Sequence, residues 1–398
     1  MILINSCRLL FCLALTAGVI LSGIPAEAEP DLSRKYHYLR GAYQYGSVMK
    51  TNEFVEGDNL KGEPIDTFHS ARLEFGWQTD GSQDWHHLYN FPSFGIGIYS
   101  ADYFNEEELG KPTSLYGFFC WPAKRWSPRW QWTVDVAFGL TDNWVAYDPV
   151  SNPKNIAMGA AHSVHIDLGT NIEYRFARHW SLLGGFSVTH FSNGGSQKPN
   201  SGINQIAPLL FVKYGFQEFE LPARRADITP LEPNWSFGFI PSVGKRNVAH
   251  NTADLPNPEN TVYKDYIIGT LLAQATRQTS HVTCWAGGLD FTYDESVGDL
   301  VWIEGLRQGQ VASASTWDKW SVGVFGGYER VINRAHMLLH LGYMVLRRDV
   351  DAQVPRFFQR LGLRYYVWDN VSAGLNVRLN DFSRANNLEF NLGYWFGM

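Results

Sequence analysis

The sequence predicts an all-β protein, a transmembrane antiparallel β-barrel that follows an N-terminal signal peptide. Aromatic residues make up 15% of the 398 residues and glycine contributes 37, as expected of a chain rich in strands and turns. Charged residues reach only 18%, where soluble domains carry roughly 25%. Beyond the N-terminus no apolar run reaches the roughly 18 residues that a spanning helix needs, so any membrane span must consist of strands.

Residues 1–28 have the pattern of a secretory signal peptide. Arg8 supplies the positive charge, residues 9–20 form the apolar stretch, and Ala26 and Ala28 precede a cleavage site before Glu29. The signal predicts export from the cytoplasm. Its removal leaves Cys120 and Cys284 as the mature cysteines, which excludes a disulfide scaffold and leaves open whether these two pair.

Segments with period-two alternation predict strands with one apolar face. In residues 130–140 every even position is large and apolar while the odd positions are small or polar. Residues 164–176 repeat the pattern, with Asp167 and Glu173 on the second face, where charges need water. The alternation also runs through residues 387–396, an aromatic last strand typical of outer-membrane barrels. We expect roughly sixteen strands of about ten residues each.

A soluble β-sandwich would show the same periodicity, because it also buries one face of each strand. The export signal together with interior-facing charges favours the membrane barrel over the sandwich. The formal net charge of −6 provides no basic surface for nucleic acid, so no nucleic-acid partner is expected.

The segment 189–204 carries the residues best suited to chemistry. Glycine, proline and asparagine between two strands predict a hairpin loop. Side chains two apart on a strand share a face, so His190 and Ser192 lie on the apolar face of their strand, and Asn204 lies beside them if the hairpin pairs directly. A serine next to an imidazole that a third group orients is the minimum for a serine nucleophile. The alternative is a pair of polar residues at the membrane interface without catalysis.

The residues after Ser192 could complete such a site. Asn193, Gly194 and Gly195 offer backbone N–H groups, and the glycines allow the chain to turn those groups toward an oxyanion. Metal chemistry is not expected, because His162 and His165 face opposite sides of a strand and no cysteine framework or phosphate loop is present. We expect no cofactor.

The segments 190–193, 198–200 and 202–203 resemble the active-site hairpin of the PagL-type outer-membrane lipid A 3-O-deacylases. The resemblance implies an eight-stranded barrel in the outer membrane of a Gram-negative-type cell, with lipid A or lipopolysaccharide as substrate. It implies His190 as general base and Ser192 as nucleophile, with Asn193 and Gly195 at the oxyanion.

The chain departs from that family in one position of the site. The family pattern places a glutamate where this chain has Asn204, so the acid that would stabilise the imidazolium is missing. An asparagine orients the ring without neutralising it. Asp167 and Glu173 cannot replace the glutamate, because the alternation puts both on the opposite face.

The resemblance divides the chain into a signal peptide, 1–28, a PagL-like barrel region, 29–220, and an additional half, 221–398. A shift of 191 residues overlays Tyr365 and Ser372 on Tyr174 and Ser181, and places Asp381 at the position of His190. The additional half could be a degenerate repeat or part of one larger barrel, so that one large barrel and two smaller barrels both remain open. The functional alternatives are a transport or structural barrel with an inactive hairpin, and a barrel that binds lipopolysaccharide without cleaving it. The oligomeric state is open.

Overall fold

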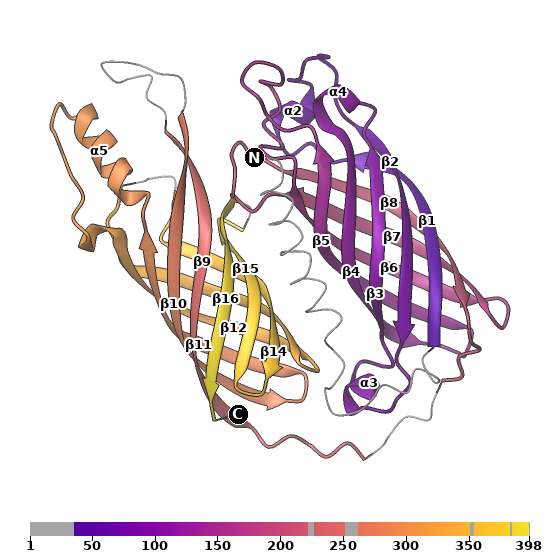
Figure 1. Cartoon of the computed structure of the whole chain (residues 1–398). Coiled ribbons are helices and arrows are strands. Elements are labelled where there is room, and N and C mark those ends of the chain that lie inside the picture. Colours follow the sequence, from indigo (N-terminus) through magenta and orange to yellow (C-terminus); the bar gives the residue numbers. More distant parts are fainter. Residues whose placement is uncertain (1–35, 222–226, 251–261, 351–353, 383, 398) are drawn as a thin grey trace. The chain divides into compact units, whose positions relative to one another are not determined.

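The computed structural model describes residues 36–221, 227–250, 262–350, 354–382 and 384–397. These residues form sixteen strands in two closed antiparallel barrels of eight strands each (Figure 1). Each barrel belongs to its own compact unit of the chain. The predicted signal peptide lies outside the described residues. No helix in the described ranges is long and apolar enough to cross a membrane.

The first barrel is an up-and-down barrel in which each strand pairs with its neighbour in sequence and β1 closes on β8. Closure is antiparallel, with Tyr38 opposite Gly215 and Val48 opposite Gln205. Its strands are β1 (Tyr36–Val48), β2 (Thr67–Gln78), β3 (Ser93–Asp102), β4 (Gly110–Arg125), β5 (Trp130–Trp144), β6 (Ser163–Arg175), β7 (Trp180–Ser192) and β8 (Ile203–Gly215).

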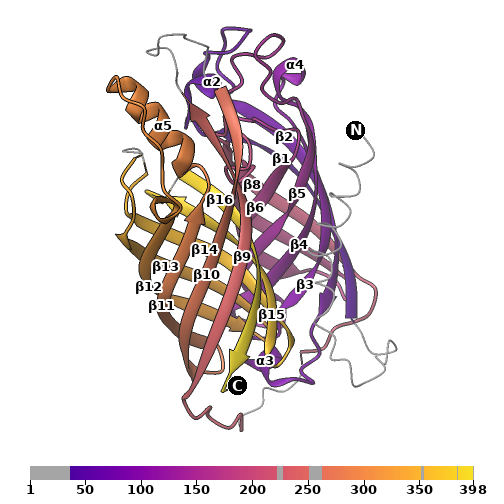
Figure 2. The ribbon, with the colours of Figure 1, turned by 60° about the vertical axis from the view of Figure 1, so that its left-hand side comes forward.

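The second barrel has the same order, and β9 closes it by pairing with both β10 and β16. Strand pairing closes the wall of each barrel, and strands β9, β10 and β16 are labelled in a second view (Figure 2). The strands of the second barrel are β9 (Asn234–His250), β10 (Val262–Ser280), β11 (Thr283–Asp294), β12 (Trp320–Ile332), β13 (Ala335–Leu346), β14 (Phe357–Trp368), β15 (Val371–Asn380) and β16 (Arg384–Phe396).

Short helices occupy some of the connections. In the first barrel the connections 49–66, 103–109, 145–162 and 193–202 meet at one end, because successive strands are antiparallel. The helices of the described chain are α2 (Glu53–Glu56), α3 (Asp84–Leu88), α4 (Glu106–Leu109), α5 (Val297–Arg307) and the 3-10 turn η2 (Trp317–Lys319).

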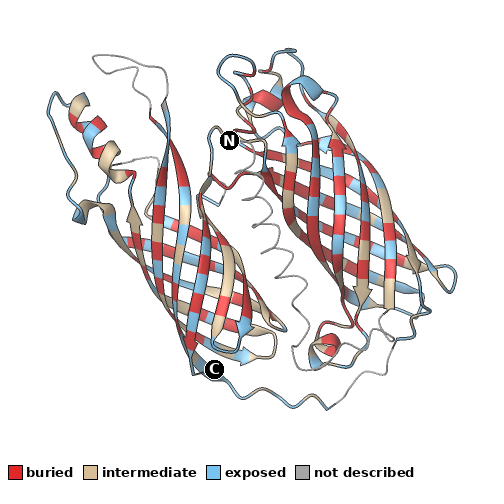
Figure 3. Ribbon diagram, in the orientation of Figure 1, coloured by how far each residue is buried: buried red, intermediate tan, exposed pale blue. Residues whose placement is uncertain are grey.

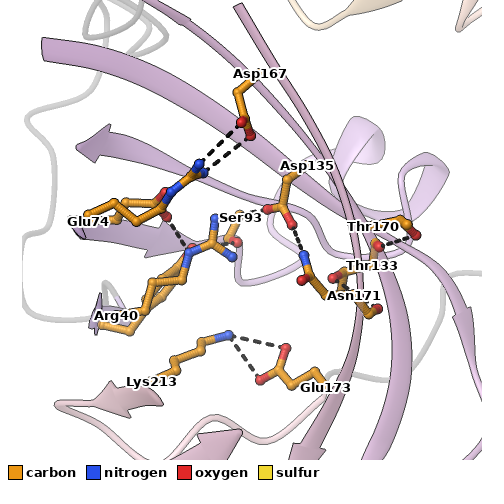
Figure 4. Close-up of polar contacts among 12 residues, drawn as sticks. Arg40, Glu74, Ser93, Thr133, Asp135, Asp167, Thr170, Asn171, Glu173 and Lys213 are labelled. Atoms are coloured by element: carbon orange, nitrogen blue, oxygen red, sulfur yellow. Dashed lines mark hydrogen bonds and ion pairs between the residues drawn. The ribbon is translucent and has the colours of Figure 1, made fainter. Parts of the chain in front are cut away.

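Buried and exposed residues alternate along the strands (Figure 3). Many exposed strand residues are large and apolar, whereas many of the buried ones are polar or charged, so the outside is apolar and the inside largely polar. In the first barrel, Arg40 forms ion pairs with Glu74 and, over 2.9 Å, with Asp135. Asp135 also accepts a hydrogen bond of 2.6 Å from Asn171 (Figure 4). A buried charge is costly unless it is paired, so these contacts are what allow charged side chains inside the barrel.

Asp167 and Glu173 lie in this interior, as the alternation predicted. Asp167 binds Arg72 over 3.2 Å, and Glu173 binds Lys213 over 3.2 Å. Neither carboxylate is on the outward face of its strand.

The second barrel is filled in the same manner. Arg360 lies between Asp290 and Glu389, at 2.8 and 2.7 Å. Glu329 accepts from Arg364 and from His336 at 3.0 Å, while His340 lies 3.1 Å from the same carboxylate. Eight strands leave an interior just wide enough for side chains, and both interiors are occupied by these networks.

The predicted strand number is confirmed, and of the two arrangements that the sequence leaves open, one large barrel or two smaller ones, the structure has two barrels of eight strands. Each set of eight strands closes by pairing its first strand with its last, so no strand remains to join a larger ring. Tyr365 and Ser372 lie on the sixth and seventh strands of the second barrel, as Tyr174 and Ser181 do in the first. Asp381 follows β15 in a turn with φ of 52°, so it is not on a strand face as His190 is. The repeat itself stays a prediction.

Replacing Arg40 by methionine should destabilise the protein, because Glu74 and Asp135 would keep their buried charges without the guanidinium. Breaking a buried pair in this way costs about 3–5 kcal/mol. The measurement is the denaturant midpoint of refolding in detergent micelles. Arg178→Met is the control, because the Arg178 side chain is 82% exposed and its ion pair with Glu218 is long, at 4.0 Å. Equal midpoints for the two variants would contradict the role assigned to Arg40.

Candidate active site

The hairpin of β7 and β8 places three polar side chains on the outside of the first barrel. Its register pairs His190 with Asn204 and Val188 with Ile206. The outward face of β7 is exposed, with 59% for Phe186 and 44% for Val188. His190 and Ser192 continue this face at the end of the strand, in the alternation that the sequence predicts. The site therefore opens toward the apolar surroundings of the barrel and not toward its interior.

The His190 ring is held by Asn204. The Nδ1 atom of His190 lies 2.7 Å from Oδ1 of Asn204, and Nδ2 of Asn204 donates to Oγ1 of Thr51 over 3.0 Å. The NH₂ group of Asn204 donates to Thr51, so the amide oxygen of Asn204 faces the His190 ring. An amide oxygen can only accept, so Nδ1 of His190 carries the proton of this hydrogen bond. The other ring nitrogen, Nε2, then carries the lone pair that a general base needs.

Gly202 borders both His190 and Ser192. It has φ of 76°, and a Cβ atom built there would lie 3.1 Å from Cε1 of His190 and 3.6 Å from Cβ of Ser192. The same Cβ would lie 2.8 Å from the carbonyl oxygen of Phe191, closer than real Cβ atoms approach. Glycine is therefore required here both by the left-handed backbone and by the space beside the ring.

Two connections distant in sequence hold the hairpin. The N–H of Met49 donates to the carbonyl of Asn204 over 2.8 Å, and the side chain of Asn52 donates to the carbonyl of Gly202 over 3.0 Å. On the other side, the N–H of Gly202 donates to the carbonyl of Ala157 over 3.0 Å. Two backbone hydrogen bonds and one from a side chain thus hold the loop end of the site to neighbouring connections.

The backbone N–H groups of Asn193 and Gly195, the expected oxyanion donors, lie in different local surroundings. The N–H of Asn193 donates to Oδ1 of Asn200 over 2.9 Å, so this donor already has an acceptor. Gly195 has φ of 80°, the left-handed conformation that turns successive N–H groups to a different side. The contacts of Asn200 and Thr51 were not predicted from the sequence.

The described residues include no group of three His, Cys, Asp or Glu side chains placed to hold a metal ion. Cys120 and Cys284 are both buried free thiols. The His190 ring contacts the amide of Asn204, and Ser192 follows two residues later on the same face of β7. A serine, an imidazole and an amide are residue types suited to acyl transfer.

The chain matches two family models that follow one another along the sequence. Residues 69–212, which include His190, Ser192 and Asn204, match the model described as lipid A 3-O-deacylase (PagL). Residues 235–398 match the model described as acyloxyacyl hydrolase, C-terminal domain. The chain belongs to the PagL family. Membership makes it an ester hydrolase of the Gram-negative outer membrane.

Several solved structures are similar to this chain, each at low sequence identity. Neisserial surface protein A is 12% identical, with 46% of this chain and 97% of that chain covered and a TM-score of 0.31. The outer membrane enzyme PagL is 15% identical, with coverages of 44% and 98% and a TM-score of 0.29. The ferric enterobactin receptor of Pseudomonas aeruginosa is 12% identical, with coverages of 86% and 53% and a TM-score of 0.23. No curated protein matches the chain.

Gly202→Ala should slow ester hydrolysis by about tenfold to a hundredfold, because the added methyl group displaces the His190 ring or the adjoining backbone. Release of fatty acid from lipid A in detergent is the measurement. Gly62→Ala is the matched control, since Gly62 also has positive φ, 69°, but a Cβ there meets nothing within 4 Å. Full activity of Gly202→Ala would show that the ring does not depend on this glycine.

Proposed function

We propose that this protein is a serine esterase that hydrolyses the ester-linked 3-O-acyl chain of lipid A. In this proposal Ser192 is the nucleophile, His190 the general base, and Asn204 the residue that orients the base. The observation that carries it is the 2.7 Å contact between His190 and Asn204 on the outer surface of the barrel, two residues from Ser192. Polar groups facing lipid are costly, which favours a functional reason for this cluster.

The reaction begins when Oγ of Ser192 attacks the ester carbonyl carbon and Nε2 of His190 takes the hydroxyl proton. The tetrahedral intermediate collapses, the bond to the sugar oxygen breaks, and His190 returns the proton to that oxygen as the alcohol leaves. Water then attacks the acyl-serine by the same proton transfers and releases the fatty acid. Through both halves, Oδ1 of Asn204 accepts from Nδ1 and keeps the ring in place.

The oxyanion would take the N–H groups that follow the nucleophile, those of Asn193 and Gly195. The Asn193 N–H donates to the neutral amide oxygen of Asn200 in the free protein. An oxyanion is a stronger acceptor than an amide, so the intermediate would displace or share this contact. In the free protein, Asn200 therefore occupies the donor that the oxyanion would use.

The position of the site in the barrel supports a substrate in the outer leaflet. Outer-membrane barrels have short periplasmic turns and longer extracellular loops. In the first barrel the hairpin loop 193–202 lies at the end that carries the long connections 49–66 and 145–162, whereas the opposite end has the short turns 126–129 and 176–179 and one longer connection, 79–92. The Ser192 end of β7 therefore corresponds to the extracellular side, where lipid A forms the membrane.

Mass spectrometry of lipid A from cells with and without the protein tests the proposal. Loss of one hydroxyacyl chain, only when the protein is present, is the expected result. Unchanged lipid A with tight lipopolysaccharide binding would favour the binding protein. Unchanged lipid A with altered solute uptake would favour the transport barrel, which the filled interiors of the barrels do not support.

Ser192→Ala and His190→Ala should each lower deacylation by about 10⁴-fold or more while the barrel still folds. Both side chains lie outside the barrel, so their removal leaves the interior networks intact. Ser100→Ala is the control, because it removes a hydroxyl from an exposed strand serine outside the hairpin. A Ser192→Ala protein that releases fatty acid at the native rate would remove the assignment of the nucleophile.

A carboxylate at position 204 should increase the rate by about tenfold to a hundredfold, because it would stabilise the imidazolium by about 1–3 kcal/mol. Asn204→Asp adds the charge without changing the side-chain length, and Asn204→Glu restores the residue of the family pattern. Asn204→Ala should lower the rate by releasing the ring. Deacylation rates of the four proteins are to be compared, and equal rates would show that position 204 takes no part in the reaction.

A further inference from the structure

We infer that Thr51 is a positioning residue of the esterase, which acts on His190 through Asn204. The inference rests on the proposed function and adds a residue from the connection between β1 and β2, far from the hairpin in sequence. Its basis is a chain of two hydrogen bonds, from Nδ1 of His190 to Oδ1 of Asn204 and from Nδ2 of Asn204 to Oγ1 of Thr51, with lengths of 2.7 and 3.0 Å.

The charged ring requires one orientation of the amide. When His190 takes the proton of Ser192, both ring nitrogens are donors, so Nδ1 needs an acceptor. The amide of Asn204 supplies one only when its oxygen faces the ring, and its NH₂ group then points away toward Thr51. The hydroxyl oxygen of Thr51 accepts from this NH₂ group and so anchors the far end of the amide in the orientation that catalysis uses.

The same contact compensates in part for the missing negative charge. Hydrogen bonds in a chain polarise one another, by an estimated 10–30% per bond. Donation from Nδ2 to Thr51 increases the negative charge on Oδ1, the atom that faces the imidazolium. A carboxylate needs no such partner to be a strong acceptor, whereas a neutral amide does. The requirement for Thr51 therefore follows from the asparagine at position 204.

The backbone fixes where the Thr51 hydroxyl lies. The N–H of Thr51 donates to the carbonyl of Met49 over 2.9 Å, and the N–H of Met49 donates to the carbonyl of Asn204 over 2.8 Å. The next residue, Asn52, accepts from the N–H of Val55 and donates to the carbonyl of Gly202. Thr51 is thus tied on both sides to the hairpin it serves. Its side chain is exposed, so changing it leaves the barrel core untouched.

Thr51→Val replaces the hydroxyl by a methyl group of similar size. We expect kcat for deacylation to fall about threefold to tenfold with KM unchanged, the loss of one neutral hydrogen bond. Thr51→Ser should restore the rate because it keeps Oγ. Thr170→Val is the matched control, an exposed strand threonine whose hydroxyl accepts from Trp132. A native rate for Thr51→Val, or a loss that serine does not restore, would overturn the inference.

A double-mutant cycle separates this role from a structural one. If Thr51 acts only through Asn204, Thr51→Val should have no further effect in the Asn204→Ala protein. Losses that multiply would show that Thr51 merely supports the loop and would overturn the inference. Labelling of Ser192 by a fluorophosphonate supplies a second readout and should follow the same pattern. A native protein with no Ser192-dependent deacylation or labelling would instead overturn the proposed function, and Thr51 with it.

Discussion

The absence of water in the membrane interior is the constraint on which this structure depends. Each backbone N–H and C=O group of a spanning strand must find a partner within the protein, which two closed barrels achieve by pairing β1 with β8 and β9 with β16. Closure then fixes which side chains face lipid and which face inward. The charges of Arg40 and Arg360 are tolerated because each lies between two carboxylates.

The same geometry produces the candidate site with few parts. Two-residue periodicity puts His190 and Ser192 on one face, and cross-strand pairing brings Asn204 opposite His190. A strand holds side chains more rigidly than a loop does, and here the strand ends are also tied to the neighbouring connections through Met49, Asn52 and Ala157. Preorganisation of the base therefore comes from the barrel wall, while the loop supplies the donors around the proposed oxyanion.

Local patterns made the strands, the outward face and the positions of His190, Ser192 and Asn204 predictable, because each depends on a period of two or on one hairpin. The number of barrels was not predictable, since it depends on which distant strands pair to close the ring. The contact between Asn204 and Thr51 spans 153 residues and exists only because β1 lies beside β8. No pattern near Thr51 marks it. The acceptor of the Asn193 N–H was missed for another reason: the sequence shows that Asn200 is nearby but not where its side chain points.

The proposed active site on the outer wall would let enzyme and substrate meet within the plane of the membrane. Ser192 shares the outward face of β7 with the exposed Phe186 and Val188, so a substrate of the proposed site would approach by lateral diffusion and keep its acyl chains in the hydrocarbon. No lipid has to be extracted into water, and no pocket has to enclose it. The rate of encounter then depends on the mole fraction of substrate in the leaflet, and dilution by other lipids slows turnover as a lower concentration would in solution.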